Sequence, residues 1–171
     1  DMIAWWPGND NANDIQGGYH GTLQNGAAMN AGLVGQAFSL DGSDDYVSTL
    51  DNEVWELQEG TFIAWFKTSA NPGSAQILID NYNYTGVNTQ TGVLLAVSSN
   101  NQLRMDVYDN GGASGVTDIQ STVTVNDGAW HLGAVTWSPA GTARLYLDSS
   151  LANSANYNGT VTYPSGTNTD L

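Results

Sequence analysis

The amino-acid sequence predicts an all-β protein, an antiparallel two-sheet β-sandwich of the jelly-roll kind. Short runs of β-branched and aromatic residues recur along the chain, and several alternate apolar with polar side chains, as strands with one buried face do. Clusters of Gly, Asn, Asp and Pro separate these runs and indicate turns. No long helical pattern lies between them, and strands joined directly by turns favour a sandwich.

The expected strands follow one another every 10–15 residues or so, a spacing typical of all-β domains. The run 103–108 shows the alternation most clearly, with Leu103 and Val107 on one face and Arg104 and Asp106 on the other. The expected strands span 61–67, 76–80, 92–98, 103–108, 122–125, 132–137 and 144–148.

Two segments depart from the strand pattern. Glutamates recur at i, i+3 and i+6 within 51–59, which predicts one or two helical turns there and leaves Trp55 exposed. The Asn-rich segment 153–159 is expected to be a loop. The other tryptophans lie in apolar runs and are expected in the core. They are Trp5, Trp6, Trp65, Trp130 and Trp137.

The composition narrows the range of partners. The 171 residues fit one domain, and they carry 17 Asp and Glu against 3 Lys and Arg, for a net charge of -14. Three cations cannot form a nucleic-acid footprint, and the negative charge disfavours anionic membranes. Cysteine is absent, and no apolar run approaches the ~20 residues of a membrane-spanning helix. An acidic, Lys-poor surface rich in Asn, Gly and Thr favours an extracellular or cell-surface location.

Five motifs occur in a recognisable order: AWWP at 4–7, GQAFSLDGSDDYV at 35–47, FIAWFK at 62–67, DGAWH at 127–131 and ARLYLD at 143–148. Together they resemble the laminin-G-like (LamG-like) jelly roll of the concanavalin A-like lectin/glucanase superfamily. The resemblance spans the chain and implies one concanavalin A-like domain over 1–171. The family has a further strand beyond the position of Leu171. We therefore expect either a fragment of a larger protein or a strand supplied by a partner chain.

The sequence does not indicate catalysis. Glycoside hydrolases of this fold carry Glu-x-Asp-x-Glu on one strand, whereas Glu53, Glu56 and Glu59 of this chain have helical spacing. His20 and His131 lie far apart and are interpreted as structural, and the Gly-x-Ser-x-Gly motif is absent. We predict that the protein is not an enzyme.

Two loops rich in oxygen donors, 10–14 and 41–45, are candidates for a calcium site, because Ca²⁺ takes six to eight oxygen ligands from irregular loops. Many proteins of the resembled superfamily bind a structural calcium near the chain termini, and the resemblance implies a structural Ca²⁺ here. The alternative is turn chemistry, in which Asp and Asn side chains bind their own backbone. The implied ligands are Asn13, Asp14, Asp41 and Asp45.

Two stretches combine aromatic, amide and charged side chains in the mixture that holds sugars, by ring stacking and by hydrogen bonds. The alternative is that these polar faces meet only water or pack over a sheet edge. The candidate ligand-binding residues are Tyr82, Asn83, Tyr84, Arg104, Asp106, Tyr108 and Asn110.

These observations predict a non-catalytic, lectin-like carbohydrate-binding module of a secreted or cell-surface protein. The net charge favours a neutral glycan over an anionic one, unless calcium bridges the two. A structural or adhesive module that packs against neighbouring modules or copies of itself is the alternative, and an atypical glycoside hydrolase is a third. The sequence does not identify the glycan, the parent protein or the oligomeric state.

Overall fold

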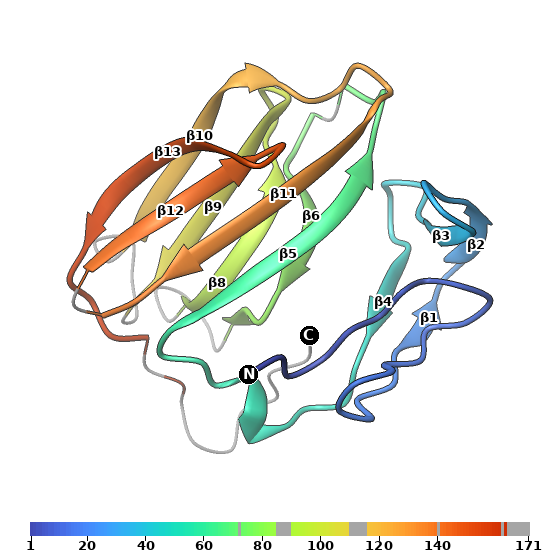
Figure 1. The fold of residues 1–171 in the computed structure, drawn as a ribbon, viewed down its shortest axis with the longest axis horizontal. Helices are drawn as coiled ribbons and strands as arrows, with labels where there is room; N and C mark the ends of the chain where they lie inside the picture. Colours follow the sequence, from blue (N-terminus) through green and yellow to red (C-terminus); the bar gives the residue numbers. More distant parts are fainter. Residues whose placement is uncertain (72, 85–89, 110–115, 140, 162, 164–171) are drawn as a thin grey trace. The chain divides into compact units, whose positions relative to one another are not determined.

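In the computed structural model the regular elements of the described residues are strands, apart from one short 3₁₀ turn, which confirms the all-β prediction (Figure 1). It describes residues 1–171 except 72, 85–89, 110–115, 140, 162 and 164–171. The chain groups into two compact units, one formed by Asp1–Val54 and a larger one that begins at Trp55. Whether the whole chain acts as a single domain stays a prediction.

The first sheet of the larger unit has five strands, all paired antiparallel. Its main order is β10-β9-β8-β6, and β7 adds to β8 beyond the end of β6. The strands are β6 (Gln76–Asp80), β7 (Asn83–Tyr84), β8 (Gln90–Val97), β9 (Gln102–Tyr108) and β10 (Val116–Thr124).

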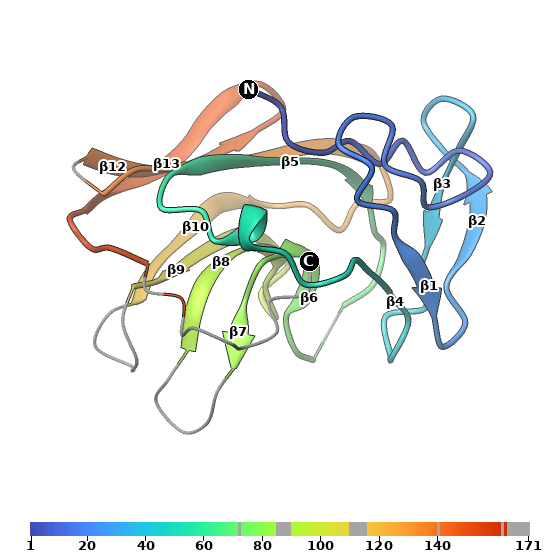
Figure 2. The ribbon, with the colours of Figure 1, turned by 90° about the horizontal axis from the view of Figure 1, so that it is seen from below.

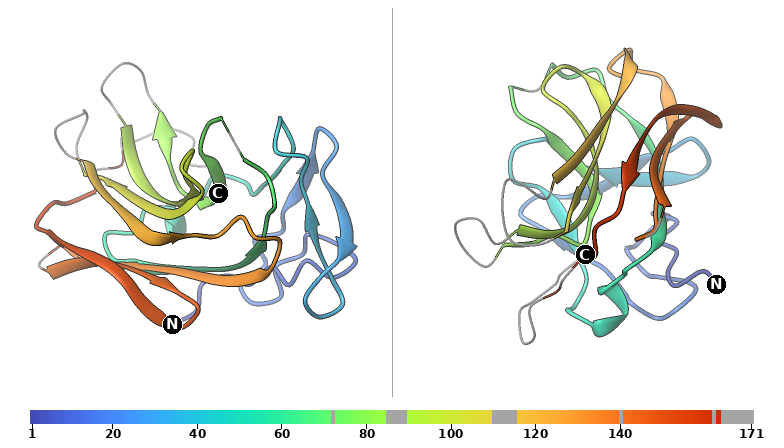
Figure 3. Two further views of the ribbon diagram at one scale, coloured as in Figure 1. Left: turned by 90° about the horizontal axis from the view of Figure 1, so that it is seen from above. Right: turned by 90° about the vertical axis from the view of Figure 1, so that its left-hand side faces the viewer.

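The second sheet of the larger unit has four antiparallel strands in the order β13-β12-β11-β5. It lies face to face with the five-stranded sheet, so this unit is a two-layer sandwich (Figures 2 and 3). The strands are β5 (Gly60–Lys67), β11 (Trp130–Trp137), β12 (Gly141–Leu147) and β13 (Ser150–Tyr157).

The core of the sandwich lies between the inward faces of these two sheets. Leu103 and Val107 of β9 are fully buried, as their alternation predicts. Gly133 of β11 marks a close approach of the layers, because a Cβ there would lie 3.2 Å from Phe66 and 3.3 Å from Leu103. Burial of each large apolar side chain stabilises the fold by about 1.5–3 kcal/mol. This packing fixes which side chains of β9 must point outward.

The smaller unit, Asp1–Val54, contains two two-stranded antiparallel sheets, β1-β4 and β2-β3. Asn25, at positive φ (62°), makes the turn after β1, and its side-chain amide binds the Asp44 backbone oxygen. The strands are β1 (Thr22–Gln24), β2 (Ala28–Ala31), β3 (Gln36–Ser39) and β4 (Tyr46–Ser48).

One expectation about local structure was wrong, and another is met in its shortest form. Asn153 to Tyr157 belong to β13 rather than to a loop, because backbone pairing with β12 holds this polar edge strand without apolar alternation. The expected helix shrinks to one 3₁₀ turn, η1 (Glu53–Trp55), where Leu57 N–H bonds the nearby Trp55 oxygen. No helix of the described residues is long and apolar enough to span a membrane.

The tryptophans divide differently from the expectation. Trp55, expected at the surface, is only 3% exposed, whereas Trp5 and Trp65 are each 54% exposed. Trp137 is buried as expected and packs edge-on against Phe62, with 5.0 Å between ring centroids. Trp65 alternates outward on β5, so its apolar character did not decide its burial. The remaining two, Trp6 and Trp130, are half-buried.

Candidate functional site

A row of acidic residues crosses the outer face of the five-stranded sheet. Strand register places Asp80 of β6 opposite Leu94 of β8, Leu94 opposite Asp106 of β9, and Asp106 opposite Asp118 of β10. Side chains directly opposite on one face have Cβ atoms about 4.5–5.5 Å apart. We call Asp80, Asp106, Asp118, Arg104, Tyr108 and Tyr82 the polar face.

Arg104 joins two of these carboxylates. Its Nε and Nη2 donate to the Asp106 carboxylate at 2.8 and 2.7 Å, and Nη2 lies 3.2 Å from the Asp118 carboxylate. Asp106 is only 1% exposed, and burial raises the pKa of its carboxyl while the hydrogen bonds from Arg104 oppose that rise. The two hydrogen bonds to Asp106 hold the Arg104 guanidinium in place.

Two tyrosines stand beside this ion pair. The Tyr108 hydroxyl donates to the Asp106 carboxylate at 3.1 Å, and burial raises the pKa of Tyr108. The Tyr82 ring meets the Tyr108 ring edge-on, with 5.1 Å between centroids. The polar face therefore joins a fixed arginine to an aromatic pair.

Asp80 and Asp118 are members of the polar face that the sequence analysis missed. Burial raises the pKa of Asp80 to about 6, against a lowering contribution from the Tyr82 backbone N–H. The Asp118 side chain is 40% exposed and contacts Arg104 from the neighbouring strand. Asp80 lies in the expected strand 76–80, whereas Asp118 lies before the expected strand 122–125, and only the register shows that both share a row with Asp106.

The structure brings four of the seven predicted ligand-binding residues together, namely Tyr82, Arg104, Asp106 and Tyr108. For Asn83 and Tyr84 only the backbone is described, as strand β7 paired with β8. Asn110 lies outside the described residues.

Asn81, immediately before Tyr82, has a structural role. It is fully buried, and its amide donates to the Trp55 backbone oxygen at 2.7 Å and to the Tyr163 hydroxyl at 2.8 Å. Its carbonyl oxygen accepts the Val93 N–H at 2.7 Å. These bonds fix the chain just before Tyr82 enters the polar face.

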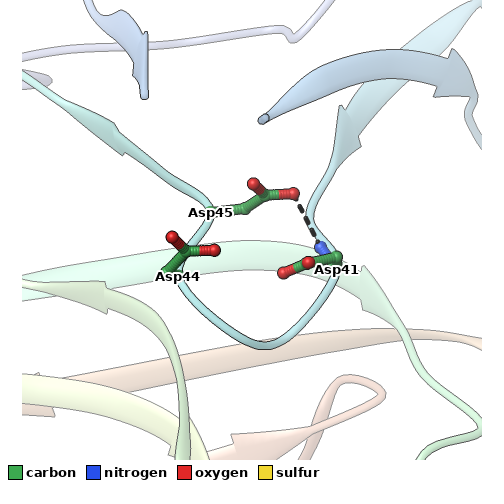
Figure 4. Close-up of side chains that lie close together, drawn as sticks. All are labelled: Asp41, Asp44 and Asp45. Carbon is green, nitrogen blue, oxygen red and sulfur yellow. Dashed lines mark hydrogen bonds between the residues drawn. The ribbon is translucent and has the colours of Figure 1, made fainter. Parts of the chain in front are cut away.

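In the smaller unit, three carboxylates gather in the loop between β3 and β4. Ligand atoms of Asp41, Asp44 and Asp45 lie within 4.8 Å of one another (Figure 4). The Asp45 carboxylate accepts the Asp41 N–H at 2.9 Å, and the Asp41 carboxylate accepts the Ser43 N–H at 2.7 Å. The group contains two of the predicted metal ligands and one carboxylate, Asp44, beyond the predicted set.

The other two predicted metal ligands do not belong to this acidic group. Asp14 is 4% exposed, and its carboxylate accepts four backbone N–H groups, from Trp5, Gln16, Gly17 and Tyr19. Burial alone would raise the pKa of Asp14, but these four bonds outweigh it and lower the pKa. Asn13 is exposed, and its N–H bonds the Asn11 side chain. Here the turn-chemistry alternative describes the geometry better.

His131 lies between two aspartates at one end of the sandwich. Its Nδ1 is 2.8 Å from the Asp148 carboxylate, and its Nε2 is 3.1 Å from the Asp127 carboxylate. The imidazole therefore links the turn before β11 to the turn after β12. Its ring also packs against Phe66, with 5.8 Å between centroids.

The fold and the polar face define a β-sandwich of the jelly-roll class, with polar and aromatic side chains on one outer face. The sequence profile described as the concanavalin A-like lectin/glucanases superfamily, of the laminin-G type, matches residues 41–171. This chain therefore belongs to that superfamily, as the motifs predicted.

Several solved structures with a similar fold are binding domains. The binding domain of Paraclostridial Mosquitocidal Protein 1 is 13% identical, with a TM-score of 0.69 over 98% of this chain and 42% of that one. The binding domain of botulinum neurotoxin DC, solved with rat synaptotagmin II, is 14% identical, with a TM-score of 0.68 over 99% and 42%.

A carbohydrate-binding neighbour is the CBM40 of a Ruminococcus gnavus IT-sialidase, solved with α2,3 sialyllactose. It is 15% identical, with a TM-score of 0.50 over 68% of this chain and 75% of that one. No curated protein matches the sequence significantly. The chain spans about two fifths of the toxin binding domains, matching 42% of the first, and at these identities the likeness concerns the fold.

Proposed function

We propose that this chain is a non-catalytic glycan-binding module of a secreted or cell-surface protein, and that its polar face holds the glycan. The observation that carries the proposal is the juxtaposition of the Tyr82–Tyr108 pair with Arg104 and Asp118 on the outer face of a rigid sheet. The carbohydrate-binding and receptor-binding domains among the structural neighbours support it.

The chemistry of the face suits sugar hydroxyls. The tyrosine rings offer apolar surface for stacking, and the Asp118 carboxylate accepts hydrogen bonds at a side chain that is 40% exposed. Buried Asp106 acts as an anchor that fixes Arg104 and Tyr108, so the donors are oriented before the ligand arrives.

The charge of the face favours a neutral glycan. Its single cation, Arg104, is already bound to Asp106 and Asp118, and Asp80 adds a third carboxyl group. An anionic sugar would meet more negative than positive charge there. The sialyllactose ligand of the CBM40 neighbour points the other way, so a sialylated glycan belongs in the test.

We also propose a structural calcium ion at Asp41, Asp44 and Asp45. The donors are all carboxylate oxygens, the ligand type that Ca²⁺ prefers, and they lie within 4.8 Å of one another. A divalent cation would offset the repulsion among three like charges and would brace the loop between β3 and β4. It would take no part in glycan chemistry.

Protein binding is a second candidate function, in a structural or adhesive module. The observation that favours it is the neurotoxin DC binding domain, which was solved in complex with rat synaptotagmin II. Under this reading the exposed sheet surfaces would contact a partner protein or a second copy of the chain.

The proposal assigns no catalysis to the chain. Glycoside hydrolysis requires two carboxyl groups flanking one bond, with roles set by their environments. Glu53 lies in η1 and Glu59 accepts a hydrogen bond from Ser138, so these glutamates do not form a pair on one strand. Incubation with the bound glycan should release no reducing sugar.

Affinity electrophoresis in gels that contain neutral polysaccharides, with a sialylated polymer in parallel, tests glycan binding. We expect one neutral polymer to retard the protein, and Tyr82→Ala and Asp118→Ala to remove most of the retardation. Ser150→Ala, an exposed change at the start of β13, is the matched control. Retardation by no polymer would sink the proposal, and retardation by the sialylated polymer alone would overturn the neutral assignment.

A further inference from the structure

The outer face of the four-stranded sheet, on the opposite side of the sandwich, carries a second cluster of aromatic side chains. Strand register sorts most of its outward residues into four rows. We call them together the aromatic face: Lys67–Trp130, Trp65–Leu132, Ile63–Ala134–Tyr146–Leu151 and Thr61–Thr136–Arg144–Ser154.

This face exposes an unusual amount of apolar surface for an outward sheet. Ile63 is 62% exposed, Trp65 54% and Leu151 55%, while Trp130 and Tyr146 are half-buried beside them. Contiguous apolar patches of this kind mark interaction surfaces, whereas single exposed apolar residues do not.

The aromatic face also differs in charge from the rest of the chain. It holds Lys67 and Arg144, two of the three cations in a chain of net charge -14, and none of the residues in its four rows is acidic. Two carboxylates border these rows and both have partners: Asp148, at the end of β12, is bound by the His131 ring and the Leu132 N–H, and Glu59, just before β5, accepts a hydrogen bond from Ser138. The face is therefore complementary to an anion.

We propose that the aromatic face binds an acidic polysaccharide, with sugar rings stacked on Trp65 and Tyr146 and carboxylates paired with Lys67 and Arg144. Each cation stands next to an aromatic side chain. Lys67 is paired with Trp130, with its Nζ 5.9 Å from the ring centroid, and Arg144 precedes Tyr146 by two residues on the same face.

The spacing of these groups suits an extended chain molecule. Trp65 and Tyr146 are separated by two strand spacings across the sheet and by a two-residue step along it, so their backbone positions lie about 12 Å apart in a straight line. That distance extends over more than one sugar ring, with a cation near each end. A polysaccharide with a carboxylate on successive sugars meets this pattern better than a single small anion does.

This site is independent of the polar face. Arg104 there is bound by two carboxylates, whereas Lys67 and Arg144 lie on the other sheet, at exposed positions. Variants of one sheet should therefore leave binding at the other unchanged. If the polar face binds no neutral glycan, the proposal for the aromatic face still stands.

The test is a titration calorimetry comparison of polygalacturonate with its fully methyl-esterified form, which keeps the backbone and masks the carboxylates. We expect the chain to bind polygalacturonate more tightly, and added salt to weaken that binding. Lys67→Gln with Arg144→Gln should weaken it about fivefold and reduce its salt dependence. Trp65→Ala, at an exposed position, should also weaken it about fivefold.

Gln120→Ala, on the outward side of the five-stranded sheet, is the matched control and should bind as the unaltered chain does. Circular dichroism of each variant checks that the fold is kept. Equal affinity for both polymers, or unchanged affinity in the Trp65 and Lys67/Arg144 variants, would overturn the proposal. Equal binding of polyglutamate with the same sensitivity to these variants would assign the face to an acidic protein segment instead, and would overturn the polysaccharide assignment.

Discussion

The His131 ring contacts carboxylates from two turns of the sandwich, those of Asp148 and Asp127. Burial alone would lower the pKa of His131, but its hydrogen bonds to Asp148 and Asp127 outweigh this and raise it above 6.5. A raised pKa in the folded state means that the protonated ring stabilises the fold below about pH 6.5, and that this stabilisation disappears as pH rises through the folded-state value.

We therefore predict that the urea midpoint of unfolding falls between pH 6 and pH 8, and that His131→Gln flattens this part of the profile. The matched control is His20→Gln, whose exposed side chain should leave the slope unchanged. Unfolding curves at three pH values suffice, and an unaltered slope in the His131 variant would contradict this account of the imidazole.

Asn81 carries a second prediction at the residue scale. Asn81→Ala leaves the buried Val93 N–H and Trp55 oxygen without these partners, which should cost about 2–4 kcal/mol of unfolding free energy. Tyr163→Phe removes one of the three bonds, together with the bond from the Tyr163 hydroxyl to the Leu57 oxygen, and should cost about 1–2 kcal/mol. Denaturant unfolding measures both, and equal losses in the two variants would show that Asn81 is not the centre of this network.

At the scale of elements, the start of β8 depends on one glycine. Gly92 has φ of +123°, and a Cβ on it would lie 2.6 Å from the Asn81 backbone oxygen. Gly92→Ala should therefore destabilise the fold by about 1–3 kcal/mol. Gly73→Ala, where the added methyl meets nothing within 4 Å, is the control and should change little. Thermal melts of the two variants compare them directly, and equal melting temperatures would contradict the strained geometry.

The loop between β3 and β4 carries the calcium prediction. If Asp41, Asp44 and Asp45 hold Ca²⁺, then millimolar calcium should raise the melting temperature, and a chelator should reverse the rise. Asp44→Asn with Asp45→Asn should abolish the response, whereas Asp10→Asn, in the other acidic loop, should not. An unchanged melting temperature on adding calcium would leave these residues as turn formers only.

At the scale of the whole molecule, alternation and turn residues were enough to predict the sandwich. The alternation in 103–108 predicted which side chains of β9 face outward, and the structure places Arg104, Asp106 and Tyr108 there. Sheet register was not readable in the same way, because it depends on pairing between distant strands. Asp80 and Asp118 therefore joined the polar face only once the strands were aligned.

The sequence also did not predict which individual side chains are buried or which groups they bind. Trp55 and Trp65 have the same side chain, yet Trp55 is buried at the end of η1 and Trp65 faces outward on β5. Asp14 has a carboxylate that could bind a metal ion, yet that carboxylate accepts hydrogen bonds from four backbone N–H groups. Such outcomes depend on tertiary packing, which a local pattern does not encode.

The central claim is that the polar face binds a glycan. Nuclear magnetic resonance titration of the ¹⁵N-labelled chain, with an oligosaccharide from the polymer that retards it most, tests this claim directly. The account predicts that the largest amide shift changes fall on Tyr82, Arg104, Tyr108 and Asp118, and that they disappear in Tyr82→Ala. Shift changes confined to other strands, or none at saturating ligand, would contradict it.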